Sequence, residues 1–289
     1  MNLLRILTAS LIAVLLTGSA RADEPKKSVN EEKLFDIEVV KDLAYNDAKD
    51  ADPDKQKLDL YLPKGQKDFP VLFFVHGGTW KSGDRKQYDR LGNLYAARGL
   101  GTVVISYRLT PKVQHPAHIQ DVARAFAWTC ANIGKYGGKA DQLFCCGHSA
   151  GGHLVSLLAT DESYLKAEKR SFSDIKGVIS ISGVYTILPA GALAKAFGSD
   201  AEVCKKASPI NNVSSKHPPF LILYGDADFP TLDWMAESMG KALEKAKCEV
   251  STQKMTKRTH YTIMYNMLEA EDPTRQALLD FVNKHTEKK

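Results

Sequence analysis

The hydrophobic and polar positions of the chain follow two periodicities, that of buried strands and that of amphipathic helices. Short runs that are apolar at almost every position predict strands covered on both faces, and residues 58–62 predict a strand in which Leu58, Leu60 and Leu62 alternate with Asp59 and Tyr61. The predicted strands span residues 35–40, 58–62, 71–75, 102–105, 143–146, 178–181, 220–224 and 249–254.

Helical periodicity separates these strands. The predicted helices span residues 87–98, 119–133, 153–160, 232–246 and 275–284, and the second carries Ile119, Val122, Phe126 and Ile133 on one face. Strands that alternate with helices predict an α/β fold, with a mostly parallel sheet of about eight strands and helices on both faces. Residues 183–219 lack a clear period, and we expect a long irregular connection there.

The first residues have the pattern of a signal peptide. A positively charged Arg5 precedes the apolar residues 6–16, and Ala20-Arg21-Ala22 fits a cleavage site, so we predict a signal peptide over residues 1–22. The apolar run is too short for a comfortable membrane span, and we expect no stable membrane insertion after cleavage. The protein is then exported, periplasmic or extracellular, with a flexible leader at residues 23–32 and a single domain at 33–289.

The charge of the chain bears on whether it binds nucleic acid. The formal net charge of +5 is weakly basic, and no basic stripe with interleaved aromatic residues occurs, so we expect no nucleic-acid partner.

The odd cysteine count leaves at least one thiol unpaired. Cys145 and Cys146 lie on a predicted strand and point to opposite faces, which makes them poor partners for each other. The pairing of Cys204 with Cys248 stays open, as do the role of Cys130 and the oligomeric state.

One motif carries the clearest chemistry. Residues Gly147-His148-Ser149-Ala150-Gly151-Gly152 read G-x-S-x-G between a predicted strand and a predicted helix, the context of a nucleophile elbow. The glycines give room where strand and helix approach, and the helix directs the positive end of its dipole at the serine oxygen. We therefore predict that Ser149 is a nucleophile; Ser156 and Ser182 do not lie on such a turn.

The glycine-rich segment after strand 71–75 is the second feature. Ligands of a parallel sheet bind outside the carboxyl ends of its strands, where His76-Gly77-Gly78-Thr79-Trp80 lies. The backbone N–H groups of Gly78 and Thr79, together with that of Ala150, predict an oxyanion hole.

A base and an acid are expected at two other strand ends. His260 lies in a polar segment after strand 249–254, and it is the candidate base. Asp226 and Asp228 both follow strand 220–224, and position alone leaves either as the acid. The order serine, aspartate, histidine is that of α/β-hydrolases.

The remaining histidines receive structural interpretations. We expect His148 to orient the serine turn and His76 to brace the oxyanion loop. His115, His118 and Asp121 form H-x-x-H-x-x-D, but neither nearby cysteines nor an H-E-x-x-H pattern accompany them. We therefore predict no metal and no cofactor.

Taken together, the motifs resemble one protein family. They are His76 to Asp84 (H-G-G-T-W-K-S-G-D), Ser106-Tyr107-Arg108-Leu109, the serine elbow, Ser208-Pro209-Ile210, Pro219 to Asp228, and His260. This set resembles the esterase/lipase branch of the α/β-hydrolases, which includes feruloyl and acetylxylan esterases, kynurenine formamidases and hormone-sensitive-lipase-like carboxylesterases. The resemblance extends over about residues 57–284.

The resemblance implies a triad of Ser149, Asp228 and His260, although Tyr224 replaces the histidine of the family's H-G-x-x-D pattern. It implies a secreted serine carboxylic-ester hydrolase that acts through an acyl-enzyme on short-chain or carbohydrate-linked acyl esters of the acetyl or feruloyl type. The alternatives are an arylformamidase or peptidase of the same fold, and a catalytically inactive binding module. No helical cap is expected before Lys57, so the site should be open and bordered by residues 183–219.

Overall fold

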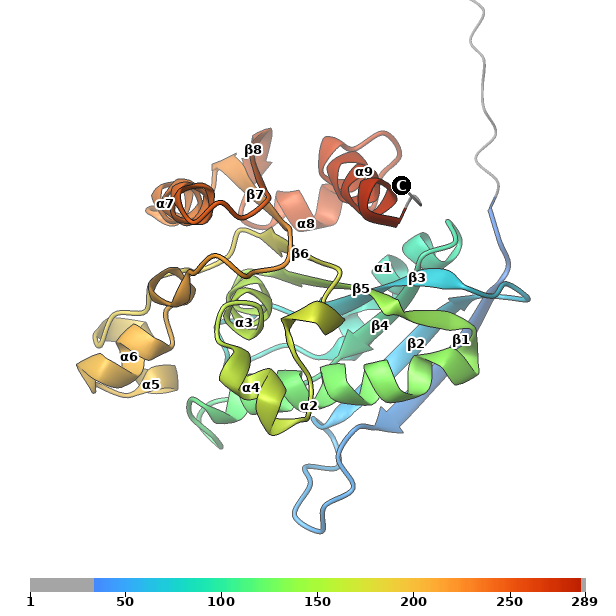
Figure 1. Ribbon diagram of the computed structural model, residues 1–289, viewed down its shortest axis with the longest axis horizontal. Helices are drawn as coiled ribbons and strands as arrows, with labels where there is room; N and C mark the ends of the chain where they lie inside the picture. Colours follow the sequence, from blue (N-terminus) through green and yellow to red (C-terminus); the bar gives the residue numbers. More distant parts are fainter. Residues whose placement is uncertain (1–33, 287–289) are drawn as a thin grey trace, which may run out of the picture. The chain divides into compact units, whose positions relative to one another are not determined.

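An eight-stranded sheet organises the part of the chain that the structure, a computed structural model, describes, which is residues 34–286 (Figure 1). The strands follow the order β1-β2-β4-β3-β5-β6-β7-β8. Strand β2 runs antiparallel to β1 and β4, and all other neighbours are parallel. Their bounds are β1 Ile37–Ala44, β2 Lys57–Pro63, β3 Phe69–Val75, β4 Gly101–Ile105, β5 Gly138–His148, β6 Gly177–Ile181, β7 Phe220–Ala227 and β8 Val250–Thr259.

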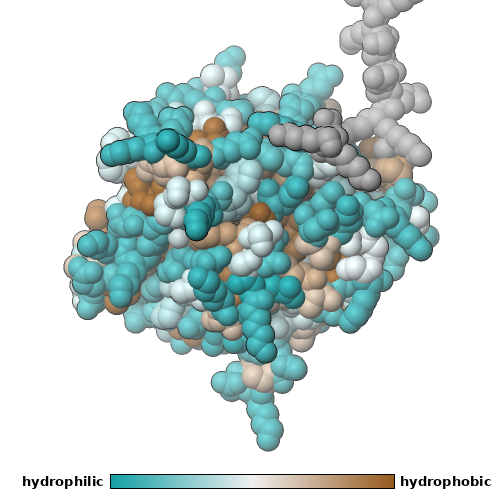
Figure 2. Space-filling model, viewed as in Figure 1, coloured by the Kyte–Doolittle hydropathy of each residue, from teal (hydrophilic) through white to brown (hydrophobic). Residues whose placement is uncertain are grey.

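Helices cover both faces of this sheet, as predicted. Phe73 of β3 belongs to a buried cluster that includes residues of α2, α3 and α7, whereas its neighbours Leu72 and Phe74 belong to a second cluster that includes residues of α1, α8 and α9. Cys145 and Cys146 are divided between the two faces in the same way. The helices are α1 Asp89–Ala96, α2 Ala117–Asn132, α3 Ala150–Leu158, α4 Glu162–Ala167, α5 Gly191–Phe197, α6 Ala201–Lys206, α7 Leu232–Lys245, α8 Thr262–Asn266 and α9 Pro273–Thr286. The surface viewed in Figure 2 is mostly hydrophilic, with hydrophobic residues scattered over it.

Several predicted boundaries are wrong by a few residues: β1 ends at Ala44 rather than at residue 40, and β5 spans Gly138–His148 rather than 143–146. Two other predictions are also wrong. The segment 183–219, expected to be irregular, holds α5, α6 and a 3₁₀ turn at Pro209–Asn212. Helices of six or seven residues are too short for a period to stand out, although Asp200 caps α6 by accepting hydrogen bonds from the N–H groups of Glu202 and Val203. Strand β8 was expected to end near residue 254 but continues to Thr259, which pairs with Ala227.

Three further expectations concern the N-terminal residues, the cysteines and membrane-spanning helices. The predicted signal peptide and leader lie outside the described residues. All five cysteines are free, so Cys204 and Cys248 do not pair. Within residues 34–286, no helix is both long enough and apolar enough to cross a membrane.

A buried arginine anchors the loop that follows β3. Arg85 is 2% exposed; its Nε donates to Asp59 at 2.9 Å, and its guanidinium also pairs with Asp42. Its backbone N–H donates to Ser106 Oγ at 2.9 Å. Because Arg85 directly follows the motif His76 to Asp84, which contains the glycine-rich segment, these contacts fix one end of the loop after β3.

We expect Arg85→Ala to lower the free energy of unfolding by about 3–5 kcal/mol, because it leaves the buried carboxylate of Asp59 without its cation. Urea denaturation monitored by circular dichroism measures this. The neighbouring exposed Lys86→Ala should change stability by less than about 0.5 kcal/mol. Equal losses in both variants would contradict the anchoring role.

Candidate active site

Ser149 lies at the tip of a sharp turn between β5 and α3. Its φ of 55° is one that side-chain-bearing residues rarely adopt. Glycines make the turn possible, because a Cβ on Gly151 would lie 2.0 Å from the carbonyl oxygen of Val75, and one on Gly147 would lie 2.4 Å from the Gly151 backbone. The Ser149 N–H donates to the carbonyl of Ile181 at 2.9 Å, which ties the turn to β6.

Three strand ends bring the predicted residues together. His260 Nε2 lies 3.0 Å from Ser149 Oγ, and His260 Nδ1 lies 2.7 Å from Asp228 Oδ1. Ser149 follows β5, His260 follows β8, and Asp228 follows β7. All three side chains are largely buried. The hydroxyl, imidazole and carboxylate thus form a continuous hydrogen-bonded chain.

Asp226, the alternative acid, does not contact the imidazole. Its exposed carboxylate accepts hydrogen bonds from the backbone N–H groups of Lys257 and Arg258 on β8. It therefore holds the edge strand β8 against β7.

The environment of Asp228 keeps its carboxyl ionised. Burial raises the pKa of Asp228, but hydrogen bonds from His260, Ser182 and the Phe229 N–H together bring that pKa below its usual range. A carboxylate next to Nδ1 makes that nitrogen the protonated one, which leaves Nε2 to accept the proton of the Ser149 hydroxyl.

His148, inside the serine turn, contacts His260 as well as the residues of its own turn. Its Nε2–H donates to the backbone carbonyl of His260 at 2.8 Å. Burial, helped by the nearby His260, lowers the pKa of His148 to about 3, so the ring is a neutral donor. It positions the backbone of His260, which extends the role expected from the sequence.

The loop after β3 presents unpaired backbone donors. Gly78, Thr79 and Trp80 have φ values of 110°, 53° and 58°, and a Cβ on Gly78 would lie 2.2 Å from the carbonyl oxygen of Ser82. Among residues 34–286, the N–H groups of Gly78, Thr79 and Ala150 have no protein acceptor. Gly78, Thr79 and Ser149 line one cleft, where such donors can receive an oxyanion.

His76 lies beneath this loop and packs between two tyrosines. Its ring stacks on Tyr107 at 4.4 Å and on Tyr88 at 6.4 Å, and its Nδ1–H donates to the Gly77 carbonyl at 2.7 Å. These contacts support the first residues of the oxyanion loop from below.

The cleft above Ser149 has a volume of about 740 Å³. Most of its walls are apolar or aromatic, with Gln87 and Arg90 as polar exceptions; the apolar and aromatic residues include Trp80, Tyr88, Leu193, Phe229, Tyr261 and Tyr265. Val184 and Leu193 come from the segment 183–219, which borders the site as expected.

Trp80 both lines this cleft and packs into the protein. Its indole N–H donates to His153 Nδ1 at 3.3 Å, and His153 Nε2–H donates to the Ala207 carbonyl at 2.8 Å. The ring of Phe197 packs edge-on against Trp80 at 4.9 Å. This wall of the cleft is therefore held rigidly.

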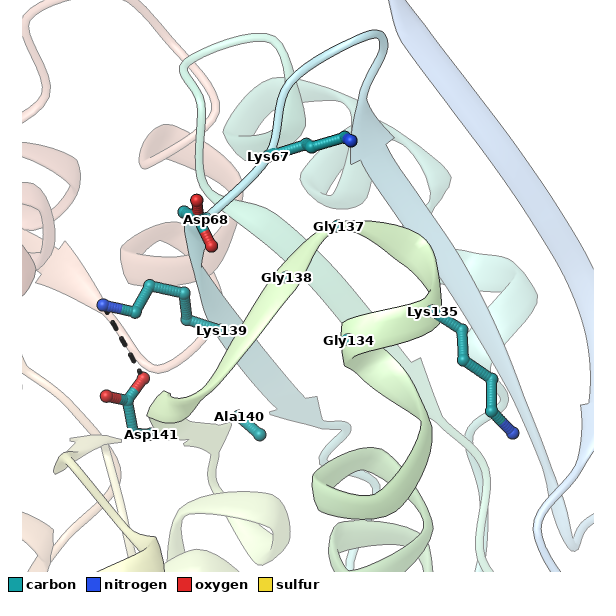
Figure 3. Close-up of a pocket in the computed structure, with 9 residues that line it drawn as sticks. All are labelled: Lys67, Asp68, Gly134, Lys135, Gly137, Gly138, Lys139, Ala140 and Asp141. Carbon is teal, nitrogen blue, oxygen red and sulfur yellow. Dashed lines mark ion pairs between the residues drawn. The ribbon is translucent and has the colours of Figure 1, made fainter.

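A second hollow, of about 630 Å³, lies at the opposite ends of the strands, where β3 and β5 begin (Figure 3). Lys139 and Asp141 face each other there across 3.9 Å, whereas Lys135 points away. The charged side chains of this hollow reach into solvent, and the residues that line it include no serine, cysteine or histidine. The chemistry that the sequence predicts is confined to the cleft around Ser149.

The H-x-x-H-x-x-D motif does not assemble. Asp121 forms two hydrogen bonds to the Arg108 side chain, each 2.8 Å long, and His118 Nε2–H donates to Thr110 Oγ1 at 3.2 Å. His115 packs against the ring of Phe197. Within residues 34–286, no three candidate ligands are arranged to hold a metal ion.

The strand order, with β2 alone running opposite to the other strands of the described sheet, and the serine elbow between β5 and α3 define an α/β-hydrolase fold. The chain belongs to the BD-FAE family, whose model matches residues 58–232. These findings confirm the resemblance to the esterase/lipase branch.

Individual relatives extend the comparison. The chain is 35% identical over 199 residues to esterase LipC of Mycobacterium tuberculosis, which covers 61% of this chain and about half of LipC, at 49%. It is 26% identical to kynurenine formamidase of Danio rerio over 89% of this chain and 87% of that protein. Among solved structures, a truncated carbohydrate esterase from gut microbiota superposes with a TM-score of 0.74 at 21% identity, covering 89% of this chain and 99% of the other.

Buried neutral histidines predict a loss of stability in acid. Burial lowers the pKa of His153 to about 3 and that of His76 to about 4, whereas histidines of the unfolded chain titrate near about 6.5. Below pH 6.5 the unfolded state therefore binds more protons, and the free energy of unfolding falls toward pH 4 by up to about 1.4 kcal/mol per pH unit for each such histidine.

Urea titrations at several pH values between 7 and 4.5 measure this slope. His153→Gln removes one titrating group, so its stability should depend less steeply on pH than that of the wild type. An unchanged slope would contradict the assignment.

Proposed function

We propose that this protein is a secreted serine carboxylic-ester hydrolase that works through an acyl-enzyme. The observation that carries the proposal is the chain of contacts from Ser149 Oγ through His260 to Asp228, beside unpaired N–H groups. The similarity to esterase LipC and to a carbohydrate esterase supports it. The predicted signal peptide supports export.

The geometry suits two successive acyl transfers. Ser149 Oγ attacks the ester carbonyl carbon while His260 Nε2 takes the hydroxyl proton, and the N–H groups of Gly78, Thr79 and Ala150 bind the oxyanion. The carbon–oxygen bond to the alcohol then breaks, and the imidazolium returns its proton to the departing oxygen. Water, deprotonated by His260, attacks the acyl-enzyme, and its proton passes to Ser149 Oγ as the acid leaves.

Aromatic faces favour a ring-bearing alcohol on the leaving side. Because His260 protonates the leaving oxygen, groups around its ring line the site of the alcohol. The Phe229 ring stacks on His260 at 4.2 Å, and Tyr261 lies edge-on at 5.4 Å; they are 46% and 56% exposed. Such exposed faces can stack against the flat face of a sugar ring. We therefore propose an acyl group linked to carbohydrate as the substrate.

The cleft favours the larger of the two expected acyl groups. The cleft of about 740 Å³ includes the aromatic rings assigned to the alcohol, and its other walls, at Trp80, Tyr88 and Leu193, offer apolar contact that an acetyl group would use only in part. An aromatic acyl group of the feruloyl type fills such a cleft better.

Hydrolysis of an arylformamide is the second candidate. The full-length similarity to kynurenine formamidase favours it, and the same serine chemistry cleaves a formyl amide. An assay with an N-formyl anilide beside a feruloyl ester on the purified protein separates the two.

Ser149→Ala should lower kcat for p-nitrophenyl acetate by at least about 10⁴-fold and prevent labelling by a fluorophosphonate, because both need the Oγ nucleophile. Ser156→Ala, which removes another buried hydroxyl, should retain both. Wild-type rates in Ser149→Ala would refute the serine mechanism.

Tyr261→Ala should lower kcat/KM for a feruloyl oligosaccharide by about three- to tenfold while changing methyl ferulate less, because only the former presents a sugar ring for stacking. Trp234→Ala is the matched control: Trp234 is 61% exposed but does not line the cleft. Equal losses on both esters would contradict the sugar contact.

A further inference from the structure

Ser182, directly after β6, lies between the strand ends that carry the nucleophile and the acid. Its backbone N–H donates to the Leu223 carbonyl of β7 at 2.7 Å. The preceding residue, Ile181, accepts the N–H of Ser149 at 2.9 Å. The end of β6 therefore connects Ser149 on one side with the strand of Asp228 on the other.

The Ser182 side chain makes a direct contact with the acid. Its hydroxyl donates to Asp228 Oδ2 at 2.5 Å, and both side chains are about 1% exposed. The same oxygen accepts the Gly225 N–H at 3.2 Å, and Oδ1 accepts the Phe229 N–H at 2.8 Å as well as His260 Nδ1–H. Of the described residues, only Ser182 and His260 contribute side-chain donors to this carboxylate.

The backbone at Ser182 would suit glycine better than serine. Its φ is 49°, in the left-handed region that glycine adopts without steric cost. A residue held in such a conformation indicates that its surroundings, and often its function, require the side chain. What serine adds to glycine here is the hydroxyl that Asp228 accepts.

We propose that Ser182 is a positioning residue for the ester hydrolysis proposed above, on which this inference rests: it holds the Asp228 carboxylate in the orientation that receives His260 Nδ1–H. Ser182 does not line the cleft, so it acts through Asp228 and does not touch the substrate.

The consequence of losing the hydroxyl follows from burial. A charge-assisted hydrogen bond in a buried site is stronger than a neutral one, and water cannot replace it without space. Without it, Oδ2 keeps only the longer hydrogen bond from the Gly225 N–H, so the carboxylate is held less firmly toward the imidazole and the imidazolium of the transition state is less stabilised. The chemical step slows, and the binding of substrate does not change.

Two substitutions of Ser182 distinguish the effect of losing the hydroxyl from the effect of backbone strain. Ser182→Ala and Ser182→Gly both remove the hydroxyl, but glycine relieves the strain at φ 49°, so Ser182→Gly should be the more stable of the two. We expect kcat to fall about tenfold in both, with KM unchanged within about twofold. Ser156→Ala is the control, because its hydroxyl donates only within its own helix, to the Gly152 carbonyl. Wild-type kcat in Ser182→Gly would overturn the proposal.

A double-substitution cycle tests whether Ser182 acts through Asp228. In an Asp228→Asn background, Ser182→Ala should cause no further loss of kcat, because the interaction it serves is already gone. An undiminished tenfold loss in that background would show that Ser182 acts elsewhere and would overturn the proposal.

A spectroscopic readout needs no activity. The far-downfield ¹H NMR resonance of His260 Nδ1–H should move upfield in both Ser182 variants and stay in place in Ser156→Ala. An unmoved resonance overturns the positioning role even if the wild type is active. A shifted resonance in a protein without Ser149-dependent hydrolysis supports the positioning of Asp228 and counts against the proposed function alone.

Discussion

The close contact between the first turn of α3 and the end of β3 determines the geometry of the whole site. Only a residue without a side chain fits at Gly151, because the Val75 carbonyl occupies the place of a Cβ. This contact brings the amino end of α3 beside the residue where the glycine-rich loop begins. Ser149 and the unpaired N–H groups of Gly78 and Thr79 consequently share one small space, although more than 65 residues separate them in the chain.

Around this contact the protein arranges charge unevenly. His76, His148 and His153 are buried and uncharged at neutral pH, whereas Asp228 is held ionised by its donors. In the mechanism proposed above, the Asp228 carboxylate stabilises the positive charge that His260, the imidazole it contacts, gains when it takes the serine proton. The surrounding histidines serve as hydrogen-bond donors and packing groups, so they do not compete for the proton.

Local sequence patterns predicted much of this, and contacts between distant strands account for the rest. The elbow around Ser149 is readable because its glycines and its flanking strand and helix are contiguous, and apolar runs placed His260 and both aspartates near strand ends. The choice of Asp228 over Asp226 came from resemblance. The contact of Ser182 with Asp228 joins residues 46 positions apart and depends on the pairing of β6 with β7, which no periodicity encodes. The stacking of Phe229 on His260 likewise depends on the pairing of β7 with β8, which no periodicity encodes.

The unpaired state of the cysteines has a practical consequence. Burial raises the pKa of the Cys145 and Cys146 thiols, so these groups remain protonated and react slowly with oxidants. No covalent cross-link joins the described part of the chain. The polypeptide can therefore reach its native arrangement in a reducing medium as readily as in an oxidising one, and a recombinant version lacking residues 1–22 needs no disulfide-forming host or isomerase.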